Sequence, residues 1–193
     1  MSFGAPERKM GLKGSPTLEI YLEDVHLPAD RLVGAVGDGL RLALATLDRT
    51  RTTVAAQAVG IDQGALDVAT AHLRQRRQLG APLASLQGLQ FMVADLEIRI
   101  RAARALTYAA ARELDAGGAS GGGSGEVAVA GAAAKCFASD VAMRVTTDAV
   151  QLLGGAGYVG DCPVERMMRD AKVTQIYEGT NQIQRLVIAR SLL

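Results

Sequence analysis

The chain has 193 residues, enough for one sizeable domain, and its 21 basic and 20 acidic residues give a net charge of +1. Basic residues are scattered among acidic ones and only 4% of residues are aromatic, which argues against a nucleic-acid-binding surface. Arg, Asp or Gln interrupts every apolar stretch, and the first residues lack the pattern of a secretory signal. We therefore expect a cytoplasmic protein with no membrane span.

Residues 1–37 predict a short β segment. Residues 17–27 mix β-branched, aromatic and charged side chains in near alternation, which is typical of one or two strands, and Pro28 ends the run. One or two strands without further partners do not make a domain. We therefore expect the remnant of a sheet whose other strands lie outside this chain or come from another chain.

From residue 38 onward the apolar residues recur at helical spacing. The pattern predicts a first helix of about 35 residues, in which Gly60 and Gly64 suggest close approach of another helix. The stretch 117–125 is rich in Gly and Ser and is typical of a loop between antiparallel helices of one bundle. The other helices are expected from about Ser85, from Glu126 to Leu152, from Pro163 towards Lys172, and after Thr180. The predicted fold is mainly α, an up-and-down bundle of three long helices plus short C-terminal helices, with a short N-terminal β stub.

Glu178 precedes the last predicted helix. Gly179 and Thr180 follow it, and Thr180 is a favourable N-cap residue. The carboxylate is therefore expected in the turn that opens the helix, where free backbone N–H groups and the helix dipole favour its ionised form. A general base needs that form, but an acid before a helix is also a common stabilising device. Position alone leaves both interpretations open.

Other kinds of site find little support in this bundle. A di-metal centre needs Glu-x-x-His pairs on facing helices of the bundle. His72 has no Glu at that spacing, and His26 lies in the predicted β segment and not on a bundle helix, so we expect no metal. No Gly-rich loop follows a predicted strand and opens a helix with the spacing of a phosphate-binding motif. Clusters at 48–51, 74–80 and 151–155 each have a structural explanation, as an i,i+3 ion pair, a basic last helical turn and a Gly-Gly cap.

Taken in series, these clusters resemble the acyl-CoA dehydrogenase family. The resemblance covers almost the whole chain and implies that residues 1–37 are the end of the family's middle β-domain and residues 38–193 its C-terminal helical bundle domain. The matching segments are 9–14, 25–28, 32–34, 37–39, 48–51, 76–80, 151–157, 163–166, 168–172 and 176–185.

The resemblance implies FAD-dependent dehydrogenation of an acyl-CoA thioester between Cα and Cβ. Glu178 matches the base that removes the α-proton while hydride passes to flavin N5. In the family, a backbone N–H at the glutamate and a flavin ribose hydroxyl polarise the thioester carbonyl. Some members carry the base on the long helix instead, where this chain has no acid around Thr50.

The resemblance also implies binding residues and partners. Arg76 and Gln78 match positions that hold FAD, typically that of a neighbouring subunit, so a homo-oligomer (dimer or tetramer) is expected. Leu79 stands where the family usually has Phe. An electron-transfer flavoprotein or a similar acceptor is the implied electron partner. The further matches to FAD-binding positions are Gln151, Gly154, Gly155, Thr180 and Gln182, and those near the substrate are Asp48, Arg51 and Gly179.

The family's N-terminal helical domain and most of its β-domain precede the matching part. The expected enzyme is therefore a C-terminal portion that needs those domains, supplied by a partner chain if necessary. One alternative is a non-catalytic helical oligomerisation or partner module derived from the family. A second is an acyl-CoA oxidase on the same bundle. The intact segment 177–180 counts against a related flavin monooxygenase, which would not need Glu178.

Overall fold

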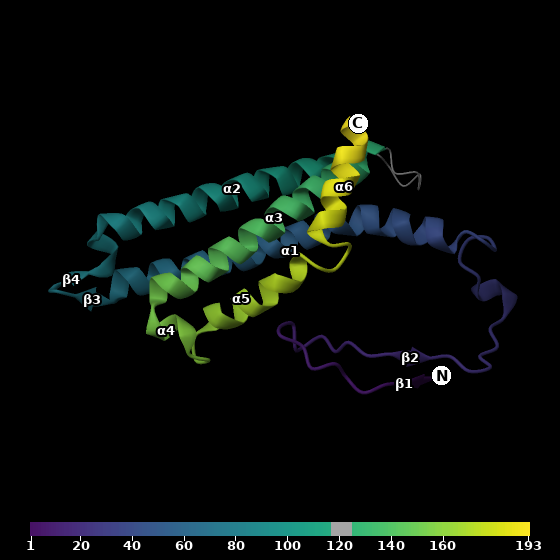
Figure 1. Cartoon of the computed structure of the whole chain (residues 1–193), viewed down its shortest axis with the longest axis horizontal. Coiled ribbons are helices and arrows are strands. Elements are labelled where there is room, and N and C mark those ends of the chain that lie inside the picture. The colour runs from purple at the N-terminus through teal and green to yellow at the C-terminus, as the bar shows by residue number, and fades with distance from the viewer. Residues whose placement is uncertain (117–124) are drawn as a thin grey trace.

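The computed structural model describes residues 1–116 and 125–193, and its main body is a helical bundle (Figure 1). Three long helices, α1 (Gly39–Gln75), α2 (Gln87–Ala116) and α3 (Gly125–Leu153), run alternately up and down. Shorter helices follow as α4 (Gly155–Tyr158), α5 (Pro163–Thr174) and α6 (Asn181–Leu192). The predicted mainly α bundle is confirmed. The predicted loop at 117–125 lies outside the described residues, except for Gly125, which begins α3.

Helix α3 is the centre of the bundle and packs against α1, α2, α5 and α6. Many of the side chains buried between α1 and α3 are alanines, so the two helices approach closely. They approach closely at Gly131, where a Cβ atom would lie 3.0 Å from the carbonyl oxygen of Asp48. Gly60 has nothing within 4 Å of its virtual Cβ, so it does not mark a helix contact within the described chain. At Gly64 the contact is an ordinary one of 3.4 Å with Met167 Cε.

The N-terminal segment, residues 1–38, forms an extended arm beside the bundle (Figure 1). Its strands β1 (Ser2–Phe3) and β2 (Ile20–Tyr21) pair antiparallel, and the 3-10 helix η1 (Ala29–Arg31) follows. The strands are shorter than the sequence suggested, and most apolar side chains of the arm are exposed.

The arm contacts the bundle at helix α5. The N–H of Leu12 donates to Asp170 Oδ1 at 2.6 Å, and Arg169 donates to the carbonyl of Met10 at 2.8 Å. A Cβ on Gly11 would lie 2.4 Å from the carbonyl oxygen of Arg169, so only glycine fits this contact without movement of the backbone.

A short hairpin joins α1 to α2 and was not predicted. Strands β3 (Arg77–Gln78) and β4 (Ala81–Pro82) pair antiparallel, and the 3-10 helix η2 (Leu83–Ser85) follows. Leu79 and Gly80 make the turn with φ values of 51° and 81°, the left-handed pair that a two-residue hairpin requires. Leu79 is fully exposed at its tip.

Some apolar residues that recur at helical spacing are nevertheless exposed in the structure. Leu40 and Leu44 are 74% and 50% exposed because the first turns of α1 extend beyond the other helices (Figure 1). Phe137 is 40% exposed on the side of α3 that no other helix covers completely. Among the helices described, none is long and apolar enough to cross a membrane. The described residues also contain no group of three metal-ligating side chains.

Candidate active site

The turn between α5 and α6 carries Glu178, and its backbone is unusual. Glu178 has a φ of 57° and Gly179 a φ of 89°, so two consecutive residues are left-handed. This conformation is ordinary for glycine but costs a residue with a side chain roughly 1–2 kcal/mol. Thr180 occupies the N-cap position of α6 as expected, but its hydroxyl makes no capping hydrogen bond. The N–H of Asn181 instead donates to the carbonyl of Gln175 at 3.0 Å and closes the turn.

The side chains of the turn dock onto helix α1. The half-buried Glu178 carboxylate accepts a hydrogen bond of 2.6 Å at Oε2 from the hydroxyl of Thr50. The Tyr177 hydroxyl donates to Gln57 Oε1 two turns further along α1. Burial raises the pKa of the Tyr177 phenol, and the adjacent Glu178 charge adds to this effect, so Tyr177 is neutral at physiological pH. The carboxylate of Glu178 is thus fixed against α1 with one oxygen already accepting a hydrogen bond.

The backbone carbonyls of the turn point into the bundle, where buried donors bind them. The carbonyl of Glu178 accepts from Gln184 Nε2 at 3.1 Å and from Arg51 Nε at 3.5 Å. The carbonyl of Gly179 accepts from Gln184 Nε2 at 2.9 Å and from Lys135 Nζ at 2.8 Å. Within the described part of the chain, no hydrogen bond involves the N–H groups of Glu178 or Gly179. These two donors are therefore available to a ligand beside the carboxylate.

Asp48 and Arg51 lie in α1 beneath the same turn. They form the i,i+3 ion pair that their spacing predicts, with 2.6 Å between Arg51 Nη1 and Asp48 Oδ1. The Arg51 side chain is only 6% exposed, whereas that of Asp48 is 25% exposed. Arg51 therefore binds mainly the carbonyl of the turn and the carboxylate of Asp48. Asp48 is more accessible to a ligand than Arg51 is.

The predicted site residues fall into two groups at different places along the bundle. Glu178, Gly179, Thr180 and Gln182 lie at the α5–α6 turn, close to Asp48 and Arg51. Arg76 and Gln78 are exposed at the far end of α1 and on the β3–β4 hairpin. The 25 positions between Arg51 and Arg76 correspond to roughly 38 Å of helix.

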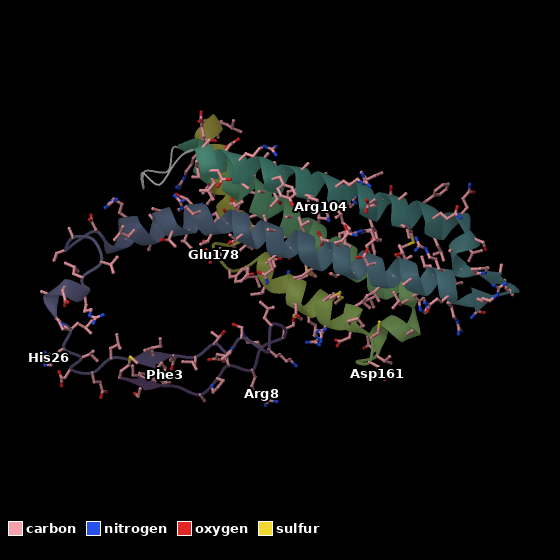
Figure 2. All side chains as sticks on the ribbon, turned by 180° about the vertical axis from the view of Figure 1, so that it is seen from behind. Phe3, Arg8, His26, Arg104, Asp161 and Glu178 are labelled. Atoms are coloured by element: carbon pink, nitrogen blue, oxygen red, sulfur yellow. The ribbon has the colours of Figure 1, made fainter. Side chains whose placement is uncertain are left out.

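The glycine-rich end of α3 belongs to the distant group. Gln151, Gly154 and Gly155 are exposed where α3 gives way to α4, at the same end of the bundle as the hairpin (Figure 1). The two groups lie towards opposite ends of the bundle. In Figure 2, Glu178 is labelled towards one end, and Asp161, in the loop between α4 and α5, is labelled towards the other. The structure thus brings the predicted residues together in two clusters and not in one.

Both clusters have room for parts of a dinucleotide. A cavity of about 600 Å³ lies beside Thr180 and Gln182 and is bordered by the ion pair between Arg185 and Asp140. At the distant cluster, Gly154 has a φ of 59° and open space around its virtual Cβ, so a ligand can approach the backbone there. Arg76 presents an exposed guanidinium, which suits a phosphate group. The residues present are chemically compatible with FAD, provided that the two clusters serve different cofactor molecules.

The sequence did not reveal a role for three residues that bind the turn: Thr50, Lys135 and Gln184. Thr50 was considered only as a position without an acid, and its hydrogen bond links residues 128 positions apart. Lys135 gave a signal that could have been used, because it is the single charged residue between Glu126 and Asp140 in an alanine-rich helix. A lysine at a buried helical position needs a polar partner, which here is the turn.

Comparison with known proteins gives one family. The model of the acyl-CoA dehydrogenase C-terminal domain matches residues 37–193. "Probable acyl-CoA dehydrogenase FadE25" of Mycobacterium tuberculosis is 56% identical over 190 residues, which are 98% of this chain and 47% of that protein. The chain spans about half the length of the curated relatives it matches.

Solved structures agree in fold. Butyryl-CoA dehydrogenase from Megasphaera elsdenii matches with a TM-score of 0.93 at 46% identity, over 99% of this chain and 48% of that one. An acyl-CoA dehydrogenase complexed with FAD from Bacillus anthracis matches with a TM-score of 0.91 at 28% identity, over 99% of this chain and 35% of that one. The chain therefore belongs to the acyl-CoA dehydrogenase family.

Proposed function

We propose that this chain forms the C-terminal part of an FAD-dependent acyl-CoA dehydrogenase, in which Glu178 removes the α-proton of the thioester. The observation that carries the proposal is the environment of Glu178. Its carboxylate is half-buried, accepts a hydrogen bond from Thr50, and lies beside the free N–H groups of Glu178 and Gly179. A general base and a pair of donors for a developing oxyanion thus occur within one turn.

The chemistry assigns separate tasks to these groups. An α-C–H beside a thioester becomes acidic when its carbonyl oxygen is polarised, and backbone N–H groups at the glutamate are suited to do that. Glu178 accepts the α-proton at its carboxylate while the Cα–Cβ double bond forms. FAD, when bound, supplies the acceptor for the hydride that leaves Cβ. We assign Asp48, Arg51 and Gly179 to the side of the site that receives the acyl-CoA.

We further propose that each FAD is shared between two copies of the chain. Thr180 and Gln182 would contact the flavin end, beside Glu178 of the same copy. Arg76 and Gln78 lie too far along α1 to reach that cofactor, so they would hold the FAD of another copy, together with Gln151, Gly154 and Gly155. Arg51 and Arg76 are separated by roughly 38 Å of helix along α1, and this separation supports a homo-oligomer.

We propose that residues 1–37 dock onto domains that are not part of this chain, and that residues 38–193 form the C-terminal helical bundle domain. Large apolar side chains of the arm are exposed, among them Leu27 at 73%, Val33 at 80% and Val36 at 90%. An apolar surface of this kind is normally covered by a partner. The chain alone is therefore expected to be inactive until the family's preceding domains cover the arm and complete the site.

A complementation assay tests the proposal. The chain is co-expressed with the preceding half of an acyl-CoA dehydrogenase, and reduction of a dye or of electron-transfer flavoprotein by acyl-CoAs is measured. Turnover that disappears in Glu178→Gln is the expected result, and turnover retained in that variant would exclude Glu178 as the base. An assembly that stays colourless and ignores FAD would favour the non-catalytic module. Oxygen consumption with acyl-CoA in the absence of dye would favour an oxidase.

A further inference from the structure

Lys135 is a buried lysine for which neither the fold nor the proposed reaction accounts. Its side chain is completely buried in α3, and Nζ donates to the carbonyl of Gly179 at 2.8 Å and to Asn181 Oδ1 at 2.9 Å. Among the described residues, no carboxylate lies within ion-pair distance of Nζ. Burying a cation against neutral acceptors is costly, so a position of this kind is normally retained for a specific task.

The charged groups that face Lys135 come from three elements. Arg51 approaches from α1, Asp140 lies in α3 itself together with the Cys136 thiol, and Glu178 approaches from the turn. The pKa of Lys135 is lowered to about 8, mainly by burial and to a smaller extent by the charge of Arg51, whereas Cys136, Asp140 and Glu178 act in the opposite direction. Attraction to Glu178 favours the charged form of Lys135.

The contacts of Lys135 converge on the two residues that fix the path of the turn. Gly179 follows Glu178 directly, and its left-handed φ of 89° turns its carbonyl into the bundle. Asn181 begins α6, and its amide nitrogen is further bound to Ser139 Oγ at 2.8 Å and Asp140 Oδ1 at 2.8 Å. Lys135 therefore links both sides of Thr180 to α3, directly beneath the proposed base.

We propose that Lys135 is a positioning residue for Glu178: its buried ammonium group binds the Gly179 carbonyl and the Asn181 side chain and so fixes the left-handed turn that aims the carboxylate. The positioning of Glu178 rests only on the geometry of these contacts. The consequence for turnover rests on the proposed function, so the test has one arm for each.

The first arm measures amide hydrogen exchange in the 193-residue chain. Lys135→Met keeps the length of the side chain but removes its donors and its charge. We expect the protected amides of Tyr177 and Asn181 to exchange about tenfold faster in this variant, because one charge-assisted hydrogen bond is lost. Amides in the core of α2 and α3 should exchange as before, since Met suits a buried position.

Matched variants separate positioning from general stability. Lys135→Arg retains the charge and the donors and should retain most of the protection, and it provides a second test if Lys135→Met does not fold. Lys13→Met removes an exposed lysine in the arm and should leave the turn unchanged. Unaltered exchange at Tyr177 and Asn181 in Lys135→Met would overturn the proposal. Equally fast exchange throughout the bundle would overturn it too, because that result indicates a purely structural residue.

The second arm uses the complemented enzyme. Lys135→Met should lower kcat by about tenfold and leave KM for acyl-CoA nearly unchanged, because the base is misaligned and the binding surface is intact. An unchanged kcat in an active assembly would overturn the positioning role. If the wild-type assembly shows no turnover, the proposed function fails, and the exchange experiment still decides the role of Lys135.

Discussion

The hydroxyl of Thr50 donates a hydrogen bond of 2.6 Å to Oε2 of Glu178, which joins the middle of the first helix to the turn before the last one. An ionised carboxylate can only accept hydrogen bonds, so the hydroxyl must be the donor. No hydrogen bond to the other carboxylate oxygen, Oε1, comes from the residues that the structure describes. The contact with Thr50 thus orients Glu178 without occupying both oxygens that a base could use.

Replacing Thr50 by Val tests this orientation. Val has nearly the same shape but no hydroxyl, so one hydrogen bond to a charged acceptor is lost. We expect kcat/KM of the complemented enzyme to fall about tenfold, which corresponds to about 1.4 kcal/mol, close to the lower end of the range for a hydrogen bond to a charged group. Thr50→Ser should retain most activity. Equal activity of Thr50→Val and the wild type would show that the hydrogen bond has no catalytic role.

Asp62 gives the chain a pH-dependent stability. It is completely buried in α1, both carboxylate oxygens lack a hydrogen-bond partner among the described residues, and burial raises its pKa from 3.8 to about 8. Between pH 4 and pH 8 the folded chain therefore holds a proton that the unfolded chain has lost. Its contribution to stability is present at pH 4 and is lost as the pH rises through about 8.

Asp62→Ala should abolish the loss of folding stability that accompanies a rise in pH. At pH 8 we expect the variant to be more stable than the wild type by about 1–3 kcal/mol, the usual cost of a buried polar group without partners. The difference should shrink as the pH falls towards and below 3.8, where the Asp62 carboxyl becomes neutral in the unfolded chain as well. Urea unfolding at several pH values measures it. Asp67→Ala, at an exposed position on the same helix, is the control, and a constant difference for Asp62→Ala across this range would contradict the assignment.

Arg76→Ala should separate cofactor binding from folding. Arg76 is exposed at the end of α1, so its removal should change the free energy of unfolding by less than about 0.5 kcal/mol. Loss of a guanidinium–phosphate contact should weaken FAD retention by the assembled enzyme about tenfold. Flavin fluorescence released on dilution measures retention. Arg99→Ala, an exposed arginine of α2, should retain FAD, and equal loss in both variants would argue against a specific role of Arg76.

Two glycines should respond in opposite directions to a larger side chain. Gly60 lies within α1 with open space around it, so Gly60→Ala should stabilise the chain by about 0.5–1 kcal/mol through helix propensity. Gly131 contacts the backbone of α1 at Asp48, so Gly131→Val should destabilise it by about 1–3 kcal/mol through overpacking. Thermal unfolding of the isolated chain distinguishes them. Similar effects at both positions would mean that α1 and α3 do not meet at Gly131.

The helices could be predicted from the sequence because their determinants are local. Apolar spacing predicted the three long helices, and Pro163 and Thr180 marked the starts of α5 and α6 within a residue or two, whereas the four-residue helix α4 was not predicted. The β3–β4 hairpin escaped prediction because Leu79, and not only Gly80, adopts a left-handed conformation there. Phe137 fitted the apolar stripe of α3 but is partly exposed, because periodicity does not show which side of a central helix lacks a neighbour.

The sequence by itself determined the helical bundle and the place of Glu178 in the turn before α6, since both follow from residue types close together in the chain. Only the tertiary structure decided what surrounds that carboxylate. The partners of the turn, Thr50, Lys135 and Gln184, come from three helices, and no local pattern relates them. The separation of Arg76 from the turn is likewise a property of a straight helix in a packed bundle, which only the arrangement of the helices reveals.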